Sequence, residues 1–174
     1  LGNHGYVRTL IGDLCEDLTA GILGGRRHKT DAGCDYCPDV SVEDRFYESK
    51  AVGRDGQILV YFGRLVKDRL FAFSGRSLSY VVWHHAADTK KAATEGELIA
   101  AVLVSVKAVY CVPFAEVDRL CFELPAEPLN SAYGGTDKKT YGSRHRLPVS
   151  SLLPWLLKRF PAGVTEDERD SWPL

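Results

Sequence analysis

The sequence predicts an α/β sandwich in which helices flank a small mixed β-sheet. Helix-like and strand-like patterns alternate along most of the 174 residues. Apolar residues make up 45% and charged residues 26%, which is the balance of a folded domain and not of a disordered chain. A chain of this length typically forms one domain, so we expect residues 1–174 to fold as a single unit.

A first helix is expected over residues 6–23, because apolar side chains recur there every three or four positions. They form one stripe along the helix: Val7, Leu10, Ile11, Leu14, Leu18 and Ile22. Gly24 and Gly25 end the pattern, as glycine commonly does after the last helical turn.

Two short strands and a second helix are expected next. Residues 39–42 and 46–52 have the composition of strands, and Asp44-Arg45 between them suits the turn of a hairpin. The glycines in residues 53–56 then interrupt the chain. Residues 57–71 place their apolar side chains near one side of a helix, so we expect a second amphipathic helix there.

The middle of the chain predicts a strand, a helix and another strand. Residues 78–83 are rich in β-branched and aromatic side chains, which is typical of a buried strand. Thr94 and Glu97 have the spacing of a capping box, so a helix should begin there and end near residue 105. Residues 107–112 form the next expected strand.

The last third of the chain carries weaker signals. Pro113 at a first helical turn predicts a short helix over residues 113–120. Residues 123–148 have the Pro, Gly and Asn content of loops, and Pro154 interrupts a weak helix expected over residues 150–160. We expect the polar residues 161–174 to form a mobile tail.

Charge and cysteine content narrow the class of protein. Lys and Arg total 22 and Asp and Glu total 23, which disfavours binding to nucleic acid by bulk charge but allows one local basic face. No segment has the roughly 18–20 consecutive apolar residues of a membrane span, and no signal peptide is visible. Five irregularly spaced cysteines favour a reducing, intracellular, cytoplasmic setting. Because the chain begins at Leu1 and contains no Met, we expect it to be part of a longer natural chain.

Carboxylates and a lysine gather in the predicted hairpin. Alternate side chains of a strand share a face, so Glu48 and Lys50 should lie side by side, and Asp39 on the neighbouring strand can reach Glu48. Two carboxylates and a backbone carbonyl suit Mg²⁺, and a nearby lysine can orient a water molecule or offset phosphate charge. These residues indicate metal-assisted hydrolysis of a phosphodiester.

The pattern of an acid, any residue and a lysine is common by itself, and the sequence contains it three times. Only the pattern at Glu48 lies on a predicted strand that follows Pro38-Asp39 at hairpin distance. An exposed strand with a cross-strand ion pair is the alternative interpretation of these residues. Gly12 and Glu16 in the first predicted helix precede the hairpin, and Gln57 and Tyr61 would lie one turn apart on the second helix.

Together, these parts resemble the PD-(D/E)XK nuclease superfamily, over about residues 5–65. The Gln57-x-x-x-Tyr61 pattern is similar to an extra motif of its RecB-like branch. The resemblance implies a restriction-endonuclease-like sandwich and a nuclease that uses Mg²⁺, for which Mn²⁺ substitutes. The residues it implies are the metal ligands Asp39 and Glu48, the accessory acid and metal ligand Glu16, the catalytic lysine Lys50, and Gln57 and Tyr61 as site or DNA-positioning residues.

Other motifs leave alternatives open. Asp35 lies close enough in sequence to replace Asp39 as the first metal ligand. Cys34-x-x-Cys37, with His28 before it, is half of a structural zinc site, which needs four ligands. His84-His85 ends a predicted buried strand, where it could contact a substrate phosphate, transfer a proton or form a structural pair.

We therefore expect a Mg²⁺-dependent deoxyribonuclease, and we favour an endonuclease over an exonuclease. DNA is the expected partner, no membrane is involved, and a homodimer or larger assembly is open. Local basic clusters would form the DNA-binding face: residues 26–29, 90–91, 138–139 and 144–146. The alternatives are a non-catalytic nucleic-acid-binding or assembly module and a small zinc-stabilised interaction domain.

Overall fold

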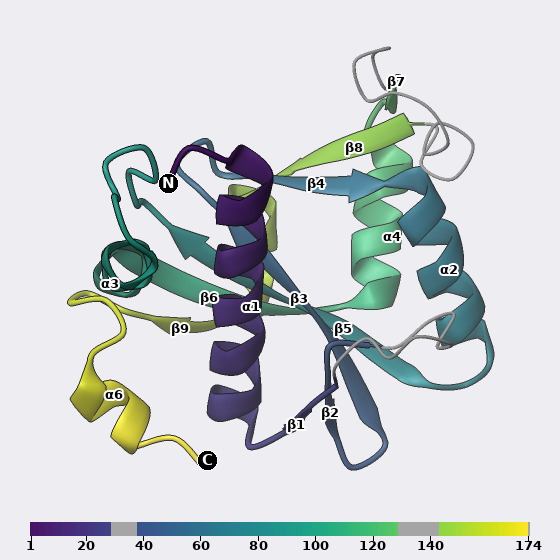
Figure 1. Cartoon of the computed structure of the whole chain (residues 1–174). Helices are drawn as coiled ribbons and strands as arrows, with labels where there is room; N and C mark the ends of the chain where they lie inside the picture. Colours follow the sequence, from purple (N-terminus) through teal and green to yellow (C-terminus); the bar gives the residue numbers. More distant parts are fainter. Residues whose placement is uncertain (29–37, 129–142, 174) are drawn as a thin grey trace.

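The computed structural model describes residues 1–28, 38–128 and 143–173. In this part of the chain, a six-stranded mixed sheet carries helices on both faces, and a three-stranded sheet packs beside it (Figure 1). The mixed α/β class predicted from the sequence is confirmed.

The larger sheet has the strand order β1-β2-β3-β5-β6-β9. The strands are β1 (Arg26–Arg27), β2 (Val40–Val42), β3 (Arg45–Val52), β5 (Ser77–His85), β6 (Val106–Pro113) and β9 (Leu156–Arg159). β3 and β5 are parallel, and the other neighbours are antiparallel. The predicted hairpin of β2 and β3 is present, with Val40 opposite Tyr47.

Helices α1 (His4–Leu23) and α3 (Glu95–Ser105) cover one face of this sheet (Figure 1). The expected apolar stripe of α1 is buried there against Trp83 and its neighbours. The helix ends where Gly24 adopts a left-handed conformation with φ of 66°, which glycine reaches without a Cβ clash. The predicted capping box of α3 also forms, although the Glu97 carboxylate accepts from the backbone N–H of Ala93.

The other face is covered by α2 (Phe62–Phe73), α4 (Phe114–Glu123) and a 3₁₀ helix, η2 (Val149–Trp155). The smaller sheet also packs here, in the order β4-β8-β7. Its strands are β4 (Gln57–Tyr61), β8 (Ser143–Pro148) and β7 (Glu127–Pro128). Apolar side chains of β5 alternate between the two cores, with Val81 and Trp83 toward α1 and Tyr80 and Val82 toward α2.

The predicted helix over residues 57–71 is wrong in its first five residues, which form β4. Ile58 and Val60 alternate as buried residues, and the whole strand pairs with β8. The sequence suggested a loop at β8, so the partner that makes residues 57–61 a strand was not visible locally.

Two expectations near the C-terminus are also corrected. Residues 149–155 form η2 and residues 156–159 form β9, instead of one weak helix, because Pro154 lacks the N–H that an α-helix needs. The segment after Pro161, expected to be a mobile tail, packs back onto the molecule. Val164 donates a backbone hydrogen bond to Leu103, and α6 (Glu166–Asp170) leads Trp172 to within 6.2 Å of the Trp83 ring, measured between centroids.

Candidate active site

The β2–β3 hairpin brings Asp39 beside Glu48 at the start of β2. The backbone N–H of Ser49 donates to Oδ2 of Asp39 at 2.8 Å, which fixes this carboxylate against β3. Ser49 itself points to the α1 face, where its hydroxyl accepts from Thr19 at 3.2 Å. Glu48 and Lys50 occupy the opposite strand face because side chains alternate, as the sequence predicted.

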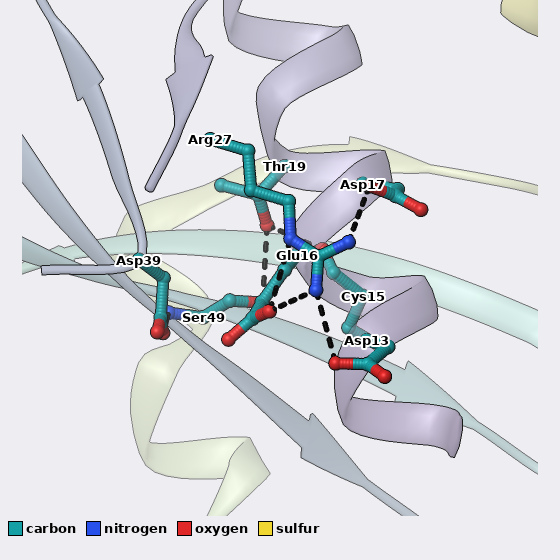
Figure 2. Close-up of polar contacts among 8 residues, drawn as sticks. All are labelled: Asp13, Cys15, Glu16, Asp17, Thr19, Arg27, Asp39 and Ser49. Atoms are coloured by element: carbon teal, nitrogen blue, oxygen red, sulfur yellow. Dashed lines mark hydrogen bonds and ion pairs between the residues drawn. The ribbon is translucent and has the colours of Figure 1, made fainter. Parts of the chain in front are cut away.

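Glu16 reaches the hairpin from α1. Figure 2 shows its carboxylate between the Arg27 guanidinium and the Asp39 side chain. Burial, then a hydrogen bond with Asp39 and the charge of Asp39, raise the pKa of Glu16 to about 7, although Arg27 acts to lower it. Two carboxyl groups in contact favour holding a proton between them. The structure thus brings together Glu16 and Asp39, which lie 23 positions apart in the sequence.

Arg27 binds three acidic side chains of α1 at once (Figure 2). Its guanidinium nitrogens lie 2.5 Å from Glu16, 2.7 Å from Asp17 and 2.9 Å from Asp13, measured to carboxylate oxygens. Glu16 and Asp17 follow Asp13 by three and four residues, so both lie near Asp13 on one side of the helix. The sequence places Arg27 only in a basic cluster and carries no sign of this role.

Glu48 is the most strongly perturbed carboxyl group of the hairpin. It is only 3% exposed, and burial, followed by the charge of Asp39, raises its pKa to about 8. Arg64 of α2 forms an ion pair with it, and Arg64 and Lys50 both lower its pKa. These cations lower the pKa of Glu48 less than burial and Asp39 raise it, so Glu48 binds a proton more tightly than an exposed glutamate does.

Arg64 also pairs with a second buried carboxylate, Asp68, which was not predicted from the sequence. Its Nε lies 3.3 Å from Oδ1 of Asp68, which is fully buried and accepts a hydrogen bond from the Tyr80 hydroxyl. The ammonium of Lys50 lies 5.5 Å from the centre of the same Tyr80 ring. The available signal was the position of Asp68, three residues after Leu65 on the apolar side of α2.

An open cavity of about 540 Å³ lies next to the hairpin, between α1, the end of β3 and β4. Four of the predicted site residues line it: Lys50, Gln57, Tyr61 and His85. Gln57 and Tyr61 share a face after all, because they are four residues apart on a strand.

The two histidines at the end of β5, His84 and His85, lie in different surroundings. His85 lines the cavity, and its Nδ1 accepts from the N–H of Ala87 at 3.2 Å, so neutral His85 carries its proton on Nε2. Burial and the neighbouring His84 lower the pKa of His85. His84 is not part of the cavity wall, and burial, with the charge of Lys107, lowers its pKa.

The carboxylates are of the right type for a hard cation, but arginines hold two of them. Within residues 1–28, 38–128 and 143–173, no group of three or more His, Cys, Asp or Glu side chains is arranged to hold a metal ion. Glu16 is paired with Arg27 and Glu48 with Arg64. A cation that used all three carboxylates would therefore have to displace these guanidinium groups.

The candidate zinc ligands Cys34 and Cys37, and Asp35 as the alternative metal ligand to Asp39, lie within residues 29–37, which are outside the described residues. His28, the third candidate zinc ligand, lies with its Nε2 2.6 Å from the Ser41 hydroxyl.

In the described part of the chain, no helix is long and apolar enough to cross a membrane. Comparison with protein-family models, with curated proteins and with solved structures finds no match.

Proposed function

We propose that this chain is a Mg²⁺-dependent deoxyribonuclease that hydrolyses DNA phosphodiester bonds in the manner of the PD-(D/E)XK superfamily, with endonucleolytic cleavage favoured. The observation that carries the proposal is the position of Asp39, which perturbs both Glu16 and Glu48 while Lys50 shares the strand face of Glu48. The order of α1, three antiparallel strands, α2 and a strand parallel to β3 supports the restriction-endonuclease-like fold.

The donor set fits a hard divalent cation in its chemistry. Asp39, Glu48 and Glu16 would hold Mg²⁺, or Mn²⁺ in its place, because these ions prefer carboxylate oxygen. Burial, and after it the charge of Asp39, raise the pKa values of Glu16 and Glu48, and a bound cation would offset both effects. When bound, the ion would supply Lewis acidity and lower the pKa of a water ligand.

The other groups of the site would prepare the substrate. Lys50 would orient the attacking water and offset the charge that builds on the phosphate. Arg64 and Arg27 would release their carboxylates, and their guanidinium groups would then be available to pair with phosphate oxygens.

Basic side chains next to the cavity support DNA as the substrate. Arg144 and Arg146 of β8 lie opposite Tyr61 and Leu59 of β4, so all four side chains share the face of the small sheet that borders the cavity. The expected cluster over residues 144–146 is thus divided, because His145 between the two arginines is buried.

The experiment is a cleavage assay on supercoiled and linear DNA with Mg²⁺, with Mn²⁺ and with EDTA. We expect nicking or degradation with either metal and none with EDTA. The Asp39→Asn variant should lose cleavage together with the rise in melting temperature that Mn²⁺ causes in the wild type. Cleavage that persists in EDTA would overturn the metal mechanism.

A second candidate is a non-catalytic nucleic-acid-binding or assembly module of the same fold. The pairing of Glu16 with Arg27 and of Glu48 with Arg64 favours it, since arginines already neutralise the carboxylates. In that case Mn²⁺ should leave the melting temperature unchanged, and DNA should be bound without being cut.

A further inference from the structure

The cavity beside the hairpin offers the groups that recognise one unit of a nucleic acid strand. Two cationic side chains line it, Arg8 from α1 and Lys50 from β3, against one carboxylate, Asp55, and neither cation forms a salt bridge with a described residue. Lys50 is partly buried, and its charge lowers the pKa of Glu48 although the two side chains form no salt bridge. Two such cations around one cavity favour an anionic ligand.

The remaining walls favour a ligand that is more than a simple anion. Tyr61 supplies an aromatic ring, Gln57 supplies an amide, and Val7 and Ile11 of α1 supply apolar surface. An aromatic ring next to cations is the combination on which bases stack while phosphates are neutralised. An amide can both donate to and accept from the edge of a base.

The size of the cavity decides between a duplex and a single strand. About 540 Å³ is the volume of a small-molecule site. A paired duplex cannot enter it, whereas one unpaired nucleotide can, as in enzymes that take a base out of the stack.

The cavity also lies next to the proposed catalytic residues Lys50 and Asp39. Ser49 and Lys50 line it, and the Ser49 N–H holds Asp39. We propose that this cavity binds one unpaired nucleotide of a single-stranded DNA segment, so that the adjoining phosphate lies between Lys50 and the carboxylates. This inference rests on the proposed function for the role of that phosphate, but binding to the cavity can be tested without cleavage.

Gly12 provides the sharpest test. It lies on α1 in the cavity wall, and a Cβ atom at this position would meet nothing within 4 Å. Because Gly12 lines the cavity, a Gly12→Phe side chain should extend over or into the cavity without a clash at Cβ. Gly96 in the first turn of α3 also has nothing within 4 Å and does not line the cavity, so Gly96→Phe is the matched control.

Binding would be measured in EDTA by fluorescence anisotropy, with a labelled single strand of about 12 nucleotides and a duplex of equal length. We expect the single strand to bind about tenfold more tightly than the duplex. Gly12→Phe and Arg8→Ala should each weaken single-strand binding about tenfold, and Gly96→Phe should not. Melting temperatures confirm that each variant is folded, and Arg8→Ala, which changes an exposed side chain, decides the matter if Gly12→Phe does not fold.

Wild-type binding by Gly12→Phe and Arg8→Ala, or equal affinity for duplex and single strand, would overturn this inference even if the protein cuts DNA. Conversely, if Gly12→Phe and Arg8→Ala weaken single-strand binding but no metal-dependent cleavage is found, the nuclease proposal fails and the single-strand site remains. The two proposals therefore fail in different ways.

Discussion

Lys50 differs from the other lysines because it sits at the junction of the carboxylates and the cavity. If it assists the attacking water, Lys50→Ala should lower the cleavage rate about 10²–10⁴-fold, as the loss of a general acid–base group does. Mn²⁺ binding, followed by calorimetry, should remain because the carboxylates are unchanged. Lys67→Ala, at an exposed position of α2, is the control and should cut at the wild-type rate. Equal rates for both variants would remove Lys50 from the site.

Glu48 should make the stability of the metal-free protein depend on pH. Its pKa is raised from 4.5 to about 8, so the folded state binds this proton more tightly than the unfolded state does. Stability is therefore fully present at low pH and falls as pH rises from about 4.5 to about 8, and Glu16 acts in the same direction up to about 7.

Glu48→Gln should weaken this dependence, because an amide cannot ionise. Since ionising the buried Glu48 costs the wild type stability, we expect the variant in EDTA near pH 8 to be more stable by about 1–3 kcal/mol, seen as a higher melting temperature. The two proteins should converge at acidic pH. Glu95→Gln, on the exposed first turn of α3, should follow the wild type. A wild-type melting temperature that rises steadily toward pH 8 would contradict this assignment.

At the scale of elements, the two faces of β4 have different surroundings, because one face lines the cavity and the other packs into the core. Gln57 and Tyr61 face the cavity, whereas Val60 is buried in the core. Gln57→Ala should lower cleavage by one to two orders of magnitude, about 1.4–3 kcal/mol in the barrier, with a nearly unchanged melting temperature. Val60→Ala should do the opposite, since it loses apolar contacts and leaves the cavity wall intact. A large stability loss in Gln57→Ala with normal turnover per folded molecule would assign Gln57 to the scaffold.

At the scale of the whole molecule, the C-terminal segment closes the α1 side of the core. Trp172 packs near Trp83, and its indole N–H donates to Glu168 at 3.1 Å. Trp172→Ala should lower stability by about 1–3 kcal/mol, seen as a melting temperature roughly 3–10 °C lower. Phe122→Ala is the matched control, since Phe122 is 85% exposed and its loss should be nearly neutral. Equal melting temperatures for the two variants would show that the segment does not stabilise the core.

Local patterns in the sequence were enough for the elements whose signal lies within a few residues. The stripe of α1, its end at Gly24 and the cap at Thr94 follow from i to i+4 contacts and from the conformation of one glycine. The alternation of Glu48 and Lys50 on β3 follows from strand geometry. These features could be predicted because each depends on covalent neighbours.

Only the tertiary structure decided which distant groups meet. β4 is a strand because β8 pairs with it 80 or more residues away, and the sequence suggested a loop there. Arg27 and Arg64 reach the carboxylates of Glu16 and Glu48 from β1 and α2, and the cavity arises where α1, β3 and β4 converge. Pairing, burial and electrostatic coupling depend on distances in space, and no short window of sequence contains them.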